Sequence, residues 1–177
     1  MTTTTTTATV PARGSRVRWL LAAVLSTRTA PRVADVGLLI VRLTLAFIFI
    51  YHGSRRLFGW FDGPGLDSSA DYFANTAHLH PGMFFAVLGG TIEFAGGIAL
   101  ALGFFSRLAG LAIFGDMMMA IITVTHADGF NSTAGAGWEL NLALGVLALV
   151  PAFFGSGRFS IDAALERRLL RADAAAP

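Results

Sequence analysis

The sequence predicts an all-α membrane protein, a four-transmembrane-helix bundle with both termini in the cytoplasm. Hydrophobic residues make up 54% of the chain and charged residues only 14%, which is too apolar for a soluble domain with a polar exterior. Four apolar segments have about the length that a helix needs to cross the hydrocarbon core of a bilayer. Arginines concentrate on one side of these segments, and this asymmetry gives the orientation.

The segment Gly82–Leu102 is the clearest of the spans, and its only carboxylate, Glu93, falls near its middle. At about 1.5 Å per helical residue the segment covers roughly 31 Å. Gly89, Gly96 and Gly97 lie four residues before Glu93 and three and four residues after it, on the same helix face. Because glycines let a neighbouring helix approach closely, this face is predicted to pack against protein that also meets Glu93.

Three further spans are predicted from hydropathy, at Val33–His52, Leu108–His126 and Trp138–Phe154. Between the first and second spans, the spacing of Ser68 and Asp71 is typical of a capping box. It predicts a short helix on the membrane surface that ends at Pro81.

Two terminal segments, 1–32 and 158–177, flank the predicted transmembrane domain 33–157. The first begins with a threonine tract that we expect to be disordered, and continues with arginines around the short apolar core Trp19–Leu25. Arginines stand where a signal peptide would be cleaved, so we favour an interfacial amphipathic segment over a signal peptide. The second segment is predicted to be a basic amphipathic tail. No nucleic-acid partner is expected.

All thirteen basic residues are arginines. Ten of them lie in the N-terminal segment, the turn at 103–107 and the C-terminal tail, whereas the loops 53–81 and 127–137 contain only Arg55 and Arg56. The positive-inside rule therefore places both termini in the cytoplasm and both loops outside. We expect a multi-pass protein of the plasma or inner membrane.

Arg42, Glu93 and Asp116 are predicted to lie near the centres of three different spans. Facing lipid, three such charges would cost roughly 8 to 10 kcal/mol on the insertion scale, so we expect them to converge inside the bundle. One cation against two acids favours a proton held on one of the carboxyl groups. Two interpretations remain open: an ion-pair network that fixes helix register, or a site that handles a substrate, a quinone or protons.

A second polar layer is predicted at the outer ends of the spans, where His52, His126 and Glu139 lie with Asn141 close behind. We expect the first three to come within reach of one another. They are either interfacial residues that bond to loop backbone or a ligand or proton site at the outer mouth. Because cysteine is absent and no HxxxH or HExxH spacing is present, the sequence predicts no metal site.

Four stretches of sequence resemble the DoxX family of small four-helix membrane proteins. They are RLTLAFIFIYHGSRRLFGWF (42–61), GGTIEFAGGIALALGFFSR (89–107), the segment from THADGF (125–130) to GWELNL (137–142), and GSGRFSID (155–162). The resemblance maps the motif positions of the family onto Arg42, His52, Gly53, Glu93, His126, Glu139 and Asp162. Asp116 lies outside it, so its predicted site rests on depth in the membrane alone.

The resemblance implies a redox-associated membrane subunit that handles a quinone or a small sulfur-type substrate, or that recruits redox enzymes. Such a chain is a non-catalytic subunit of an oxidoreductase complex or takes part in its chemistry. The alternatives are a membrane anchor or scaffold without its own activity and a small proton-coupled transporter. No covalently bound cofactor is expected, and quinone is the candidate ligand. The expected partners are the lipid bilayer, soluble redox enzymes at the cytoplasmic face and further copies of this chain.

Overall fold

The computed structural model describes residues 31–131 and 137–174, and within these ranges it contains helices and no strands. The predicted threonine tract and the apolar core Trp19–Leu25 lie outside the described residues. The elements are α2 (Pro31–Phe58), η1 (Trp60–Asp62), α3 (Gly65–Asn75), α4 (Gly82–Leu102), α5 (Ser106–Ala120), η2 (Ile121–Thr125), η3 (His126–Asp128), α6 (Glu139–Phe154) and α7 (Ile161–Ala174).

Among the described residues, three helical stretches are long and apolar enough to cross a membrane: Pro31–Phe58, Gly82–Leu102 and the continuous run Ser106–Asp128. The second of them is α4, whose ends coincide with those of the predicted span. The fourth predicted span is a shorter apolar helix, α6. The described part of the chain is therefore all-helical, with several helices as apolar as those of membrane proteins.

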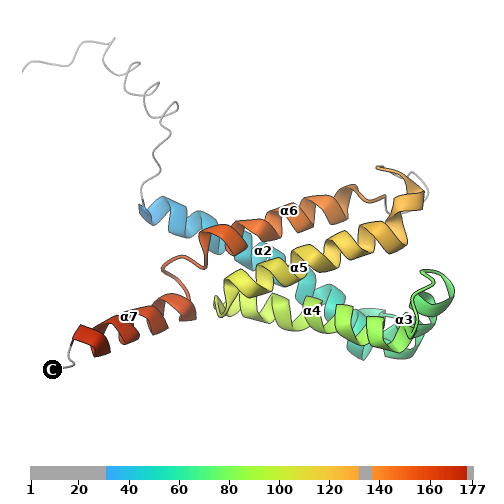
Figure 1. The fold of residues 1–177 in the computed structure, drawn as a ribbon, viewed down its shortest axis with the longest axis horizontal. Coiled ribbons are helices and arrows are strands. Elements are labelled where there is room, and N and C mark those ends of the chain that lie inside the picture. Colours follow the sequence, from blue (N-terminus) through green and yellow to red (C-terminus); the bar gives the residue numbers. More distant parts are fainter. Residues whose placement is uncertain (1–30, 132–136, 175–177) are drawn as a thin grey trace, which may run out of the picture.

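The helices pack as two antiparallel pairs, α2 with α4 and α5 with α6. Figure 1 shows α4 and α5 close together at their connecting turn and farther apart at their opposite ends, while α2 crosses behind them and α3 lies along α4. Near the turn a core of buried apolar side chains closes the bundle; it consists of Leu45, Phe49, Leu100, Ile113 and Ala148 together with smaller neighbours. The bundle is thus closed at the turn end and wider at the other.

The first helix is longer than predicted, because α2 does not end at His52 but continues to Phe58. Glycine at position 53 lets α2 approach α4 closely at this point. A Cβ there would lie only 2.5 Å from the backbone nitrogen of Phe94 on α4. The close packing of α2 against α4 holds the chain helical where a loop was expected. Arg55 and Arg56 consequently belong to the last turn of α2, where cations interact favourably with the helix dipole.

The predicted capping box at Ser68 and Asp71 is wrong, because α3 already begins at Gly65. Pro64 precedes the helix, and no side chain caps it. A proline with its fixed φ angle starts a helix without needing a side-chain cap. Inside α3 the Ser69 hydroxyl instead donates a hydrogen bond of 2.7 Å to the Gly65 carbonyl.

Arg42 is fully buried and ties the C-terminal end of α4 to the segment that precedes α7. Its Nε donates to Leu100 O at 2.8 Å and its Nη2 to Ala101 O at 3.2 Å, both in the last turn of α4. Its Nη1 donates to Phe159 O at 3.1 Å and also to Ser156 O. Four carbonyl oxygens therefore accept from one guanidinium; among them, Leu100 O also accepts from Gly103 N at 3.2 Å.

The predicted convergence of Arg42 with Glu93 and Asp116 is wrong. The antiparallel register of α2 and α4 explains why: Arg42 lies opposite Leu100, whereas Gly53 lies opposite Phe94. Arg42 still lies near the middle of α2, but the C-terminal end of α4 packs beside it, about two turns away from Glu93. The arginine that contacts Glu93 is instead Arg56, in the last turn of α2.

Asp162 completes the contacts at this end of the bundle. Its carboxylate accepts hydrogen bonds from the backbone nitrogens of Phe105, at 2.9 Å, and Ser106, at 3.1 Å. These amides are at the start of α5, where a carboxylate satisfies free N–H groups and the positive end of the helix dipole. From this anchor α7 projects away from the bundle (Figure 1).

Candidate functional site

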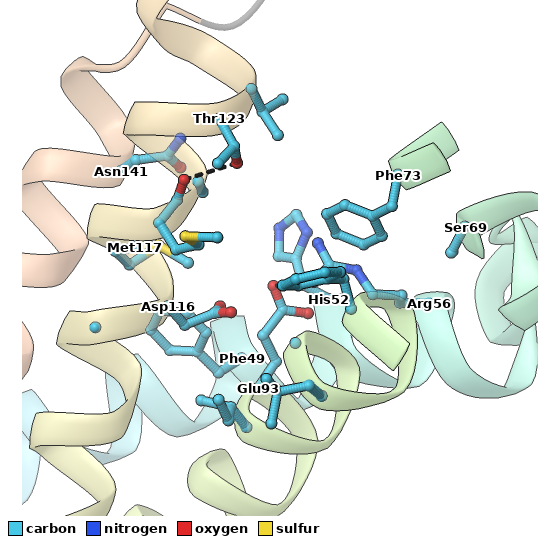
Figure 2. Close-up of a pocket in the computed structure, with 18 of the residues that line it drawn as sticks. Phe49, His52, Arg56, Ser69, Phe73, Glu93, Asp116, Met117, Thr123 and Asn141 are labelled. Carbon is cyan, nitrogen blue, oxygen red and sulfur yellow. Dashed lines mark hydrogen bonds and ion pairs between the residues drawn. The ribbon is translucent and has the colours of Figure 1, made fainter. Parts of the chain in front are cut away.

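A cavity of about 790 Å³ lies between α2, α3, α4, α5 and α6, in the wider part of the bundle. Most of its wall is apolar, with Phe49, Leu88, Ile92 and Met117 among the lining side chains. Polar side chains on one part of the wall are His52, Arg56, Glu93 and Asp116 (Figure 2). Further polar residues of the lining are Tyr72, Thr125 and Asn141. The cavity therefore offers an apolar volume with one polar wall, which is typical of small-molecule sites.

An ion pair between Arg56 and Glu93 is the centre of this wall. Arg56 Nη1 lies 3.3 Å from Glu93 Oε1, and the side chains are 28% and 5% exposed. The guanidinium also lies over the ring of Phe73 on α3, with its carbon 5.4 Å from the ring centroid. The other carboxylate oxygen of the pair, Glu93 Oε2, is buried and has no hydrogen-bond partner. A buried acceptor without a partner is costly, so this oxygen is a place for a ligand donor.

Asp116 on α5 meets the same cluster from the opposite side. A Cβ built at Gly89 on α4 would lie 2.7 Å from Arg56 Nη1 and 3.3 Å from Asp116 Oδ1, so glycine leaves the space that both groups use. Figure 2 shows the carboxyl groups of Glu93 and Asp116 turned toward the same space. One guanidinium thus faces two carboxyl groups, with a formal excess of one negative charge when both are ionised.

Comparison with known families now identifies the chain. The model of the DoxX family matches residues 37–126, just over half of the 177 residues. The chain belongs to the DoxX family. No curated protein and no solved structure matches it. The DoxX match covers Arg56, Glu93 and Asp116, so the whole charged cluster lies in the part of the chain that defines the family.

Four of the predicted site residues of this DoxX protein line the cavity: His52, Glu93, Asp116 and Asn141. Asn141 lies on the far wall, where its Nδ2 donates to Thr125 Oγ1 at 3.3 Å. His126 and Glu139 are exposed and are not part of the lining. The Glu139 carboxylate instead accepts two hydrogen bonds, of 3.1 and 3.2 Å, from Asn131 Nδ2. A ligand or proton function for these two residues stays a prediction.

Arg56 is the site residue that the sequence interpretation missed, because it was placed in an outer loop. The sequence feature that could have revealed Arg56 is its distance from His52. Arg56 follows His52 by four residues, so both lie on one face if the helix continues. The aromatic wall from Tyr72 and Phe73 was expected on the membrane surface, yet both residues line the cavity of the DoxX bundle. Their position follows from the packing of α3 against α4, which hydropathy does not reveal.

The helix that carries Asp116 changes geometry next to the cavity. After Ala120 the chain continues as a π-helical turn, Ile121–Thr125, and three of its residues, Thr123, Val124 and Thr125, line the cavity. A π-helical turn is wider than an α-helical one and shifts side chains around the axis, and such turns are frequent at functional sites. Here it brings the two threonines to the cavity wall in the DoxX bundle.

Proposed function

We propose that this DoxX protein is a membrane subunit that binds a quinone-type ligand in the cavity between α2 and α6. The observation that carries the proposal is Glu93 in the lining of an otherwise apolar cavity, with its buried Oε2 an acceptor without a partner. A quinone has the matching chemistry, since an apolar ring and chain carry two oxygen atoms that form hydrogen bonds. The volume of about 790 Å³ is within the range of small-molecule sites.

The donors and acceptors of the wall fit the head group in its reduced form. The hydroxyl of a quinol can donate to Glu93 Oε2, while Arg56 has further N–H groups that can donate to a ligand oxygen. Phe73 and Phe49 supply ring surfaces against which a flat head group can pack. Bound quinone would supply electron transfer, and the residues of this chain bind and orient its head and hold protons at Glu93 and Asp116.

The same wall disfavours the sulfur-type substrate that the family resemblance also implied. A small sulfur oxyanion would have to bind beside two carboxyl groups with only Arg56 to compensate its charge. Like charges at close range in a site with little water repel strongly. A neutral ligand avoids this repulsion, so the quinone is the better candidate.

Binding of an unlabelled benzoquinone to the purified full-length protein tests the proposal. We expect the reduced ligand to raise the midpoint of thermal unfolding, and Glu93→Gln to weaken binding about tenfold, because a hydrogen bond to a charged acceptor is lost. Glu166→Gln, at an exposed acid of α7, is the matched control and should bind as the parent does. A folded protein whose midpoint no quinone shifts at saturating concentration would contradict the proposal.

A second candidate function is the recruitment of soluble redox enzymes at the cytoplasmic face. It is favoured by α7, which projects from the bundle with exposed Arg167 and Arg168 (Figure 1). A protein that folds normally but binds no quinone would favour this function over the first.

We also propose the orientation that the arginine distribution indicates, with both termini in the cytoplasm. Reporter fusions after Arg107 and Arg171 should then report cytoplasm, and a fusion near Asp128 should report the outside. A cytoplasmic signal at Asp128 would reverse the orientation and place the wide end of the cavity inside.

A further inference from the structure

We propose that the cavity opens sideways into the bilayer between α4 and α5, and that its ligand is a lipid-borne molecule whose hydrocarbon chain leaves through this opening. This inference rests on the proposed function and extends it. It specifies the class of ligand as one with a polar head and a long apolar chain, and it specifies the route by which the ligand arrives. Three observations lead to it.

The first observation is a stripe of exposed side chains along α5. Leu111, Gly115 and Met119 follow one another at intervals of four residues and therefore lie on one face of the helix. All three line the cavity and are nevertheless exposed, Leu111 at 50% and Met119 at 39%. On α4, Leu88 lines the cavity and is 43% exposed. These four residues, here called the lateral rim, form an apolar edge at which cavity and outer surface meet.

The second observation is the depth of the lateral rim. Counted from the start of α5 at Ser106, Leu111, Gly115 and Met119 lie roughly 8, 14 and 20 Å along the helix axis. These positions fall within the hydrocarbon core, which is about 30 Å thick. The edge of the cavity is therefore surrounded by lipid chains, and a molecule that passes it comes from the bilayer.

The third observation is that the neighbouring helix pairs are closed. A Cβ at Gly97 would lie 2.9 Å from Ile50 N, and one at Gly110 would lie 2.5 Å from Ala148 O, so α2 packs directly on α4 and α5 on α6. Close packing of backbones leaves no room for a chain between these pairs. Helices α4 and α5 instead diverge from their turn, as Figure 1 shows, and the cavity lies between them.

The charged cluster and the lateral rim together define the shape of the ligand. Asp116 is adjacent to Gly115 in sequence, and Glu93 faces the same space from α4. Glu93 lines the cavity and is only 4% exposed, so a head group that meets it is held inside while the apolar edge receives the chain. A small water-soluble ligand would leave this apolar edge without an occupant.

Photo-crosslinking tests the opening directly. The probe is a benzoquinone ring with a decyl chain that carries a diazirine at its end, added to the full-length protein in lipid nanodiscs. Any lipid-facing surface will react to some extent, so the informative signal is the part that excess unlabelled decyl-benzoquinone removes. We expect this competed signal on the peptides that contain Leu88 and Leu111–Met119.

Two glycine variants sharpen the test, because a Cβ at either Gly115 or Gly37 would meet no atom within 4 Å. Gly115→Trp fills the lateral rim without disturbing the packing, and we expect it to lower the competed signal about tenfold. Gly37→Trp, an equally exposed position on α2, is the matched control and should leave the signal unchanged. Without ligand, both variants should unfold at the midpoint of the parent, which shows that both fold normally.

Each alternative outcome overturns the lateral opening. A competed signal confined to α3 or to the outer ends of the helices would mean that the ligand arrives from water. A signal at the lateral rim that no competitor removes would mean ordinary contact with bilayer lipid. In both cases the ring alone still shifts the unfolding midpoint, so the proposed function stands. If no quinone shifts the midpoint, the proposed function itself fails and the opening fails with it.

Discussion

Replacing Arg42 by leucine is expected to remove most of the folded protein from the membrane. The leucine side chain would leave the carbonyls of Ala101, Ser156 and Phe159 without this donor, and Leu100 O would keep only its hydrogen bond from Gly103 N, at 3.2 Å. Each buried acceptor that loses its partner costs about 1 to 3 kcal/mol, so we expect a loss above about 4 kcal/mol in the free energy of unfolding. The measurement is the monodisperse fraction after detergent extraction.

Two further variants separate the hydrogen bonds of Arg42 from its charge. Arg42→Lys keeps the charge but has a single nitrogen, which cannot reach four carbonyls in two segments, so we expect a partial loss. Arg158→Leu removes an exposed arginine close by in the chain and should extract as the parent does. If Arg42→Leu extracted as well as Arg158→Leu, the carbonyls would have another source of hydrogen bonds, and Arg42 would not hold α4 to the segment before α7.

The sequence predicted the helices well where hydropathy alone determines them. The ends of α4 follow from an apolar run between Pro81 and Gly103, because proline starts a helix and a glycine with φ of 65° ends one. The end of α2 could not be predicted in this way. Polar residues follow His52, and only the packing of Gly53 against α4 keeps them helical.

This one error changed the candidate site. With α2 ended at His52, Arg42 appeared to be the cation at the depth of Glu93, and Arg56 appeared to be outside. Depth in the membrane predicted that the two acids converge, which Figure 2 shows, but not which arginine they meet. The partner depends on the register between α2 and α4, and contacts between helices far apart in sequence set that register. A carboxylate inside a membrane span therefore predicts that a basic residue lies beside it, but the sequence does not show which basic residue that is.

The charge balance of the cavity gives the second large effect. Replacing Glu93 by glutamine and Asp116 by asparagine keeps the shapes of both side chains but leaves Arg56 without a carboxylate. Arginine stays protonated, so its charge cannot be removed by releasing a proton. We expect a loss of about 2 to 3 kcal/mol in stability, less than for a fully enclosed charge because 28% of the Arg56 side chain is exposed.

Adding Arg56→Met to this double variant should restore part of the lost stability, because the unpaired charge disappears while most of the side-chain volume remains. Adding Arg42→Leu instead should lower stability further, since Arg42 ties the C-terminal end of α4 to the segment before α7 and does not face the acids. The unfolding midpoint of the two triple variants in the same detergent measures the difference. If the variant with Arg56→Met were no more stable than the double variant, the two carboxyl groups would not compensate Arg56. In that case the cluster would owe its place in the cavity to a ligand and not to its own charge balance.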